Sequence, residues 1–186
     1  LSRNSTTPGS ASITVTVPVF QTSFTYYIQA KEGLTGTNPI TVTATALGFI
    51  GGTVDHDLVQ GAIDLINVPA NTTTLSSATA ISARTGIPNS QTAPTFLTQP
   101  QTLRAGAPGN LIVTFQDDDP NGASTLLLKG PVTQDTLNAQ IPVLSSSTPT
   151  DTASGGVALL PQGSGTSIIS AIAPGFLQVT SAAGSV

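Results

Sequence analysis

The sequence contains no cysteine, methionine or tryptophan, and it carries very little charge. Without cysteine the chain has no disulfide, no thiolate metal site and no cysteine nucleophile. Its single histidine, His56, excludes a histidine-rich zinc site, and its single glutamate, Glu32, excludes acid–base catalysis by a pair of glutamates. No apolar run approaches the ~20 residues that a membrane-spanning helix needs.

Charge is scarce in both signs. Only 8% of the 186 residues are charged, against about 25% in an ordinary soluble domain. The 5 Lys and Arg residues are scattered and the formal net charge is −4, so no basic surface for nucleic acid is predicted. Disordered chains combine low hydrophobicity with high net charge, whereas 38% of this chain is hydrophobic. We therefore expect a folded protein.

The abundant residues favour β-structure. The chain has 30 Thr, 19 Ser, 18 Gly and 14 Pro. Thr and Val are β-branched and suit strands, while frequent Gly and Pro interrupt helices and mark turns. Residue 1 is Leu rather than Met, so we expect a processed chain or an excerpt of a longer one.

Alternation of apolar and polar residues predicts individual strands. A period of two gives one dry face and one wet face, and it occurs in residues 12–17, 24–30, 40–46, 111–115 and 169–173. Residues 58–66 have apolar spacing that also fits a helix, but Gly61 interrupts them and we predict a strand. The predicted fold class is all-β, an antiparallel β-sandwich. The predicted core consists of Ile13, Val15, Val17, Phe24, Tyr26, Ile40, Val42, Phe49, Val113, Phe115, Ile169 and Phe176.

An internal repeat predicts the domain organisation. Residues 40–53 (ITVTATALGFIGGT) and 167–180 (SIISAIAPGFLQVT) match at an offset of 127 residues, the difference between Ala171 and Ala44. A repeat of this size indicates tandem modules. We predict modules at residues 1–68 and 69–186, the first being the C-terminal half of a repeat and the second lacking its last strand. The missing strands would then belong to a longer array or to a neighbouring molecule.

The first module resembles the later strands of bacterial immunoglobulin-like tandem repeats, which occur in large secreted or cell-surface proteins. Residues 101–115 (QTLRAGAPGNLIVTF) resemble an early strand pair of the same modules. Phe20 departs from the pattern, because those repeats often have glycine at that position. The resemblance implies Ig-like antiparallel β-sandwich modules in tandem and carries over no catalytic residue. The matching residues are Thr16-Val17-Pro18, Gln21-Thr22-Ser23, Phe24, Thr41-Val42-Thr43-Ala44 and Gly48-Phe49.

One acidic segment is a candidate calcium site. Asp117, Asp119 and Asn121 have the i, i+2, i+4 spacing of a calcium loop, and a glycine follows them. The twelfth position is Leu128, so no bidentate glutamate closes the shell. The alternative is an exposed hairpin turn, in which Asp, Pro, Asn and Gly are ordinary residues. Apart from this calcium, no cofactor is predicted.

Other polar groups are weaker candidates. His56 lies between Asp55 and Asp57, but neighbouring strand residues point to opposite faces, so we expect a solvated turn or bulge rather than a metal or catalytic site. Of the adjacent Tyr26 and Tyr27, one should be buried and the other exposed, where it could stack on a sugar. No Gly-x-Ser-x-Gly nucleophile motif occurs on a predicted strand-to-helix turn.

These observations predict a non-enzymatic extracellular or cell-surface structural protein. The absence of Cys and Met removes the side chains that oxidise most readily. Such a protein would build a stalk, sheath or filament from Ig-like modules, with β-strand complementation between subunits as a route to polymerisation. Its partners would be identical subunits or neighbouring Ig-like modules, with no nucleic acid and no membrane span. The alternative is an adhesin or a module that binds a surface glycan or receptor.

Overall fold

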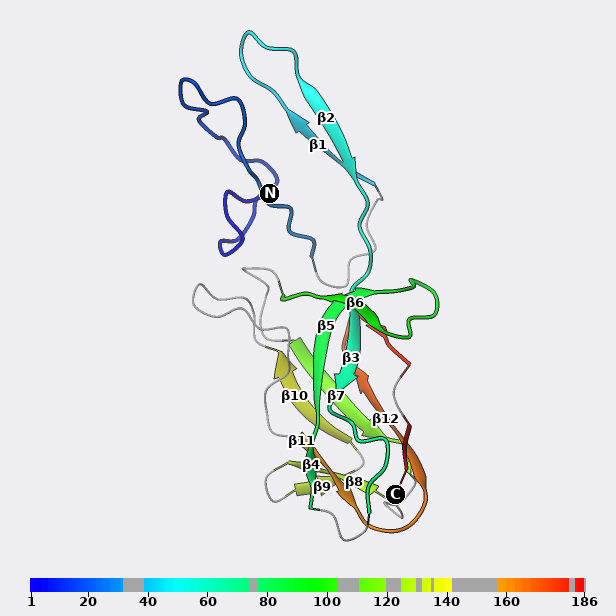
Figure 1. The fold of residues 1–186 in the computed structure, drawn as a ribbon. Coiled ribbons are helices and arrows are strands. Elements are labelled where there is room, and N and C mark those ends of the chain that lie inside the picture. Colours follow the sequence, from blue (N-terminus) through cyan, green and yellow to red (C-terminus); the bar gives the residue numbers. More distant parts are fainter. Residues whose placement is uncertain are drawn as a thin grey trace.

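The computed structural model describes residues 1–31, 39–73, 77–103, 111–119, 125–129, 132–134, 136–141, 157–180 and 183–185. These residues form fourteen β-strands and no helix, which confirms the all-β prediction for the described part of the chain (Figure 1). The strands make one two-stranded and three four-stranded sheets. The described residues accordingly include no helix that could cross a membrane.

The first four-stranded sheet has the order β10-β7-β12-β14, and all its pairings are antiparallel. The strands predicted at residues 111–115 and 169–173 are confirmed as β7 and β12. In β7, Val113 and Phe115 are buried, and in β12 Ile169 and Ala171 are buried, while the residues between them are more exposed. The bounds are β7 (Leu111–Asp117), β10 (Thr136–Ile141), β12 (Thr166–Ile172) and β14 (Ala183–Ser185).

The other two four-stranded sheets contain eight strands. One has the antiparallel order β4-β11-β8-β9, with β4 (Thr79–Ala80), β8 (Thr125–Lys129), β9 (Val132–Gln134) and β11 (Val157–Pro161). The other has the order β13-β3-β5-β6, and its pair β13–β3 is parallel. Its strands are β3 (Ala62–Ile66), β5 (Ser82–Pro88), β6 (Leu97–Pro100) and β13 (Leu177–Gln178). Since β3 lies within residues 58–66, the strand predicted there is confirmed.

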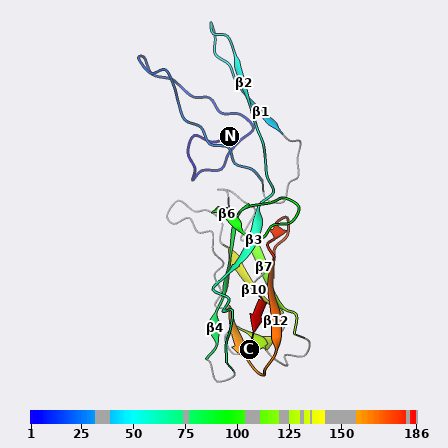
Figure 2. The ribbon, with the colours of Figure 1, turned by 45° about the vertical axis from the view of Figure 1, so that its right-hand side comes forward.

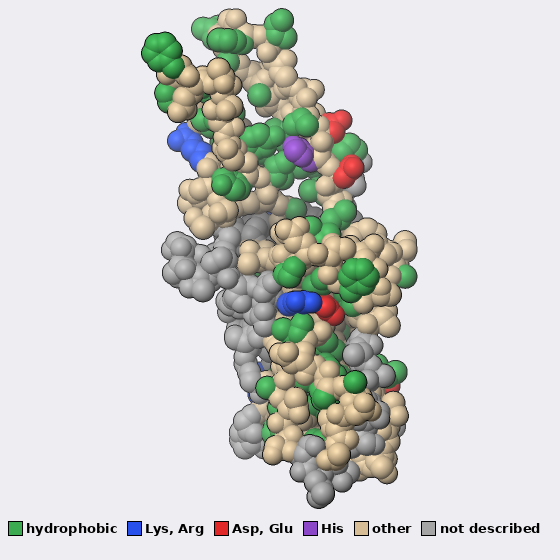
Figure 3. Space-filling view, in the orientation of Figure 1, with side chains coloured by type: hydrophobic (Ala, Val, Ile, Leu, Met, Phe, Trp, Pro, Cys, Tyr) green, Lys and Arg blue, Asp and Glu red, His purple; other side chains and the backbone are tan. Residues whose placement is uncertain are grey.

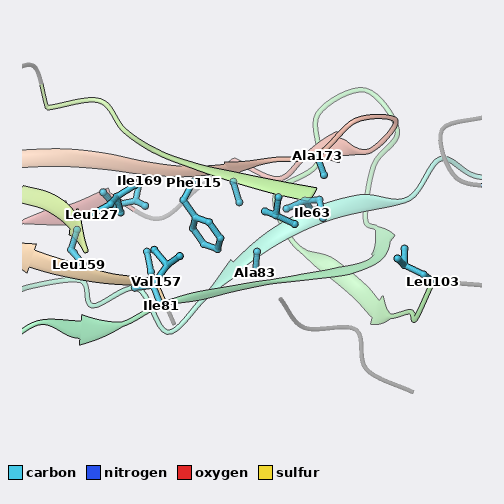
Figure 4. Close-up of a cluster of buried hydrophobic side chains, with 12 residues drawn as sticks. Ile63, Ile81, Ala83, Leu103, Phe115, Leu127, Val157, Leu159, Ile169 and Ala173 are labelled. Carbon is cyan, nitrogen blue, oxygen red and sulfur yellow. The ribbon is translucent and has the colours of Figure 1, made fainter. Parts of the chain in front are cut away.

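The hydrophobic core lies between these sheets. Phe115 of β7 is fully buried among side chains from the facing strands, with Leu127 and Leu159 toward one end and Ile63 toward the other (Figure 4). This arrangement of antiparallel sheets around one core is consistent with a β-sandwich. Val113, Phe115 and Ile169 are buried as predicted, and Phe176 is partly buried against the same cluster.

The N-terminal part of the chain has no comparable core. β1 (Ile40–Ala44) and β2 (Gly52–His56) form a two-stranded antiparallel hairpin that projects at the opposite end of the molecule from β8 and β9 (Figures 1 and 2). Within residues 1–31 and 39–60, only Ser2 is buried. The core predicted for this part is therefore wrong at Ile13, Val15, Val17, Phe24, Tyr26, Ile40, Val42 and Phe49, which are all half-buried or exposed.

Two strands predicted in this part are also absent. Residues 12–17 and 24–30 contain no strand, although Tyr27 forms an isolated bridge with Ser2. Alternation fixes which side chains would share a face, but a strand also needs a partner for its backbone hydrogen bonds. The strand predicted at residues 40–46 is confirmed, because β2 supplies that partner to β1.

The internal repeat is visible in local geometry. Gly48 and Gly175 both have φ of 80°, a left-handed conformation that favours glycine. The amide of Phe49 donates to the carbonyl of Ala46 at 3.2 Å, and the amide of Phe176 donates to the carbonyl of Ala173 at the same distance. Each repeat therefore makes the same β-turn at matching positions.

Phe20 occupies a turn position that favours glycine. Its φ is 72°, and the amide of Gln21 closes the turn by donating to the carbonyl of Pro18 at 3.0 Å. A left-handed conformation costs an L-residue roughly 1–2 kcal/mol, and the Phe20 side chain is fully exposed. Phe20 therefore has a backbone conformation that glycine would adopt without this cost.

β3 packs with the elements that follow it. All five of its residues pair with β5, and Ile63 joins the cluster around Phe115. The predicted modules, residues 1–68 and 69–186, therefore place β3 in one module and its partner strand in the other.

A close backbone approach makes Gly86 a sensitive position. A Cβ at Gly86 would lie 2.5 Å from the carbonyl oxygen of Gln99 and 2.8 Å from Leu97 Cδ1. We expect Gly86→Ala to lower the free energy of unfolding by about 1–3 kcal/mol, the usual cost of overpacking. Gly52→Ala is the matched control, since a Cβ there would meet no atom within 4 Å. Urea denaturation followed by circular dichroism measures both, and equal stability of the two variants would contradict the prediction.

Candidate functional site

A buried polar cluster is built where three strands end or begin. Side chains on one face of a strand recur every second residue, so Asp117 continues the buried face of Val113 and Phe115 in β7. For the same reason Thr125 shares the buried face of β8 with Leu127, and Ser167 shares that of β12 with Ile169. Three strands therefore bring Asp117, Thr125 and Ser167 together at one end of the core.

Hydrogen bonds join the members of this cluster. The Thr125 hydroxyl lies 2.5 Å from Asp117 Oδ2 and 2.6 Å from the Ser167 hydroxyl. The backbone amide of Asp119 donates to Asp117 Oδ1 at 3.1 Å, and the amide of Thr125 donates to Asp119 Oδ2 at 3.0 Å. Since Thr125 belongs to the β8 sheet and Ser167 to the β12 sheet, the hydroxyl pair connects two layers of the fold.

The protonation state of Asp117 determines which hydroxyl donates and which accepts in the hydrogen bonds from Ser167 to Thr125 and from Thr125 to Asp117. Asp117 and Asp119 are only 7% and 8% exposed. Burial is the main cause that raises the pKa of Asp117, and the carboxylates of Asp119 and Asp118 raise it further; the bonds from Thr125 and from the Asp119 amide oppose this. An ionised carboxylate can only accept, so Thr125 then donates to Asp117 and Ser167 donates to Thr125.

The alternative of an exposed hairpin turn is wrong for this segment. β7 and β8 belong to different sheets, so their connection is not a β-hairpin, and Asp117 and Asp119 are both buried. Asn121 lies outside the described residues. Within the described part of the chain, no three carboxylate or imidazole groups converge as a metal site. Calcium binding by Asp117, Asp119 and Asn121 stays a prediction.

Thr125 and Ser167 were not singled out by the sequence analysis. Ser167 lies two residues before the strand predicted at 169–173, so extending that strand would have placed it on the core face with Ile169. No strand was predicted around Thr125, which is followed by three leucines without alternation. Ser167 is fully buried, which keeps its hydroxyl from an external substrate. The arrangement therefore suits a structural link between sheets.

Asp55 and His56 have different hydrogen-bond partners. Asp55 accepts a hydrogen bond at 2.5 Å from the Thr41 hydroxyl, on the neighbouring strand of the hairpin. His56 points elsewhere, and its Nε2 lies 3.3 Å from the Tyr26 hydroxyl. The separation predicted from the alternation of strand residues is confirmed for Asp55 and His56. The turn or bulge expected here is wrong, because both residues belong to β2 and pair regularly with β1.

The two adjacent tyrosines have different surroundings. Tyr26 is half-buried between His56 and the ring of Phe24, whose centroid is 6.3 Å from its own. Tyr27 is more exposed. Of the predicted pair, the exposed ring is confirmed as Tyr27, whereas Tyr26 is half-buried and not buried.

Exposed apolar side chains gather at the end of the molecule that the hairpin forms. Leu47, Phe49 and Ile50, which together we call the hairpin tip, are 102%, 80% and 101% exposed. Val19 and Phe20 are exposed on a second loop of the same N-terminal part. Hydrophobic side chains are visible at this end in the space-filling view (Figure 3). Large exposed apolar groups of this kind mark interaction surfaces.

Comparisons with known proteins give no relative of this chain: no protein-family model, no curated protein and no solved structure matches it.

The raised pKa of Asp117 predicts an unusual pH dependence. A carboxyl group whose pKa is higher in the folded than in the unfolded state binds more protons when folded, so its contribution to stability falls as pH rises. We expect the wild-type chain to gain stability relative to Asp117→Asn as pH falls from 7 toward the unfolded value of 3.8. Thermal unfolding of both proteins across this range measures the stability of the wild-type chain minus that of Asp117→Asn, and a value that falls toward acid would contradict the prediction.

The calcium prediction has a direct test. If Asp119 is a ligand, calcium must raise the melting temperature of the wild-type chain, chelator must reverse the rise, and Asp119→Asn must abolish it. Magnesium serves as the control for a general ionic effect, because it needs a stricter octahedral site. An equal calcium effect on the wild-type chain and on Asp119→Asn would reject Asp119 as a ligand.

Proposed function

We propose that this chain is a non-enzymatic structural part of an extracellular or cell-surface protein, built from Ig-like β-sandwich modules in tandem. It would form a stalk, sheath or filament, and its subunits would associate by sharing β-strands. The observation that carries the proposal is the contrast between the two copies of the repeat, one covered by other strands and one uncovered.

The shared turn supports tandem modules. Gly48 and Gly175 have the same φ and are each followed by a phenylalanine whose amide closes the same turn. In a tandem array each module uses the same local devices at the same positions, so agreement in sequence and in backbone geometry is expected.

The difference in burial supports association. Ile169 and Ala171 of β12 are buried, whereas the matching residues of β1, Val42 and Ala44, are half-buried and exposed. In the second copy β12 pairs with β7 as well as with β14, but among the described residues β1 pairs with β2 alone. An uncovered apolar face with free strand edges is a template for pairing with another chain.

A binding module remains the second candidate function. The exposed ring of Tyr27 and the apolar hairpin tip favour it, because aromatic side chains on projecting loops are common contacts for glycans and receptors. In that case the exposed groups would contact a ligand of different chemistry from the chain itself.

Self-association is the first property to test. We expect the purified chain to form particles heavier than the 18.6 kDa monomer as its concentration rises, because burying the hairpin tip removes apolar surface from water. The triple variant Leu47→Ser, Phe49→Ser, Ile50→Ser should be shifted toward monomer. Light scattering and electron microscopy give mass and shape. A wild-type monomer at every concentration would reject assembly by identical subunits and favour the binding module.

A further inference from the structure

The second copy of the repeat shows which strand follows the glycine turn. After Gly175, the amide of Leu177 donates to the carbonyl of Gly61 and the amide of Val179 donates to that of Ile63, both at 2.9 Å. β13 therefore lies parallel to β3, with Leu177 opposite Ala62. In the second copy, the segment after the turn is therefore covered by β3, a neighbouring strand that directly follows Gly61.

The glycine at the start of that strand has a specific reason. A Cβ at Gly61 would lie 3.0 Å from Phe176 Cε1 and 3.2 Å from Phe176 Cδ1, so the ring rests directly against the glycine backbone. A larger side chain at Gly61 would displace the ring of Phe176. A strand that pairs beside this turn must therefore have glycine at the position that meets the phenylalanine ring.

The first copy presents the same turn without the strand. At the offset of 127 residues, Phe49 corresponds to Phe176 and Ile50 to Leu177. Phe176 and Leu177 are partly buried, whereas Phe49 and Ile50 are 80% and 101% exposed. In the described part of the chain no strand lies beside Ile50, because the sheet of β1 and β2 has only two strands.

We propose that the hairpin tip, through Phe49 and Ile50 and without Leu47, accepts an extended strand from a second polypeptide, with a glycine against Phe49 followed by a small and then a larger apolar residue, as in Gly61-Ala62-Ile63. The inference rests on the proposed function, in which strands are shared between chains, and it specifies the chemistry of the strand that the partner supplies. The strand would run parallel to the chain at Ile50 and accept a hydrogen bond from the Ile50 amide, in the way that Gly61 accepts one from Leu177.

Two observations fix the chemistry of the partner. Residues 46–52 of the acceptor carry no charged side chain, and neither do residues 61–63, which cover the equivalent turn in the second copy. An uncharged segment therefore fits without burying an unpaired charge. The donor is not β3 of another copy of this chain, since Ala62 and Ile63 are buried in their own core and their release would open it. The partner is therefore a strand that is free before it binds.

A labelled peptide tests the acceptor in the full-length chain. The probe is a synthetic peptide of residues 59–66 (VQGAIDLI) with a fluorophore and a lysine tail for solubility. We expect saturable binding by fluorescence anisotropy and slower hydrogen exchange at the amide of Ile50. Phe49→Ala in the chain should weaken binding at least tenfold. Leu47→Ala is the matched control, because Leu47 corresponds to Pro174, which stays exposed in the covered copy.

A peptide variant tests the same contact without any substitution in the chain. Replacing its glycine by leucine, the change Gly61→Leu, should also weaken binding at least tenfold, because the side chain would meet the ring of Phe49. Equal binding of both peptides, equal binding by Phe49→Ala, slowed exchange at Leu177 in place of Ile50, or no saturable binding would each overturn the inference.

Light scattering on the same samples separates this inference from the proposed function. A chain that assembles by itself but does not bind the peptide keeps its structural role and loses this acceptor. A chain that binds the peptide but remains monomeric keeps the acceptor and loses assembly by identical subunits.

Discussion

An apolar sheet face is stable in water only when a second layer covers it, and this constraint organises the whole molecule. In the larger part of the chain, β7 and β12 face β3, β8 and β11, and Phe115 is completely buried between them. In the N-terminal part, β1 has the same alternating pattern, but its sheet with β2 has no second layer among the described residues. With only 8% charged residues, the chain has few charges with which to keep such a face in solution. Association with another chain, as proposed above, would cover it.

The same constraint explains which strands could be predicted from the sequence. Alternation located β1, β7 and β12, and the interruption by Gly61 favoured the strand at β3 over a helix. It failed at residues 12–17 and 24–30, which alternate equally well but have no neighbouring strand in the described part of the chain. Alternation with a period of two predicts which side chains share a face, but it does not predict whether another segment covers that face. The core residues predicted for the first copy were therefore wrong, while Val113, Phe115 and Ile169 of the second were correct and Phe176 is partly buried.

The candidate site shows a second limit of sequence reasoning. The spacing of Asp117 and Asp119 identified the segment, but the connection from β7 to β8 crosses between sheets, which a local pattern cannot reveal. Ser167 is 50 residues beyond Asp117, the difference of their numbers, and only the pairing of β12 with β7 brings it near. Burying a carboxylate is costly, and its hydrogen bonds to hydroxyl and amide groups offset part of that cost. In return, the network fixes the ends of three strands relative to one another.

The parallel pairing of β3 with β13 also decides how the larger part of the molecule would carry a pulling force. These strands lie near its two chain ends, at residues 61–63 and 177–179, and they run side by side in the same direction. Tension applied through the chain before Gly61 and after Val179 pulls the two strands in opposite directions along their length. The hydrogen bonds between them then share the load in shear instead of opening one after another. Ala62, Leu97 and Val179 pack together beside this pair, so sliding would also expose apolar surface.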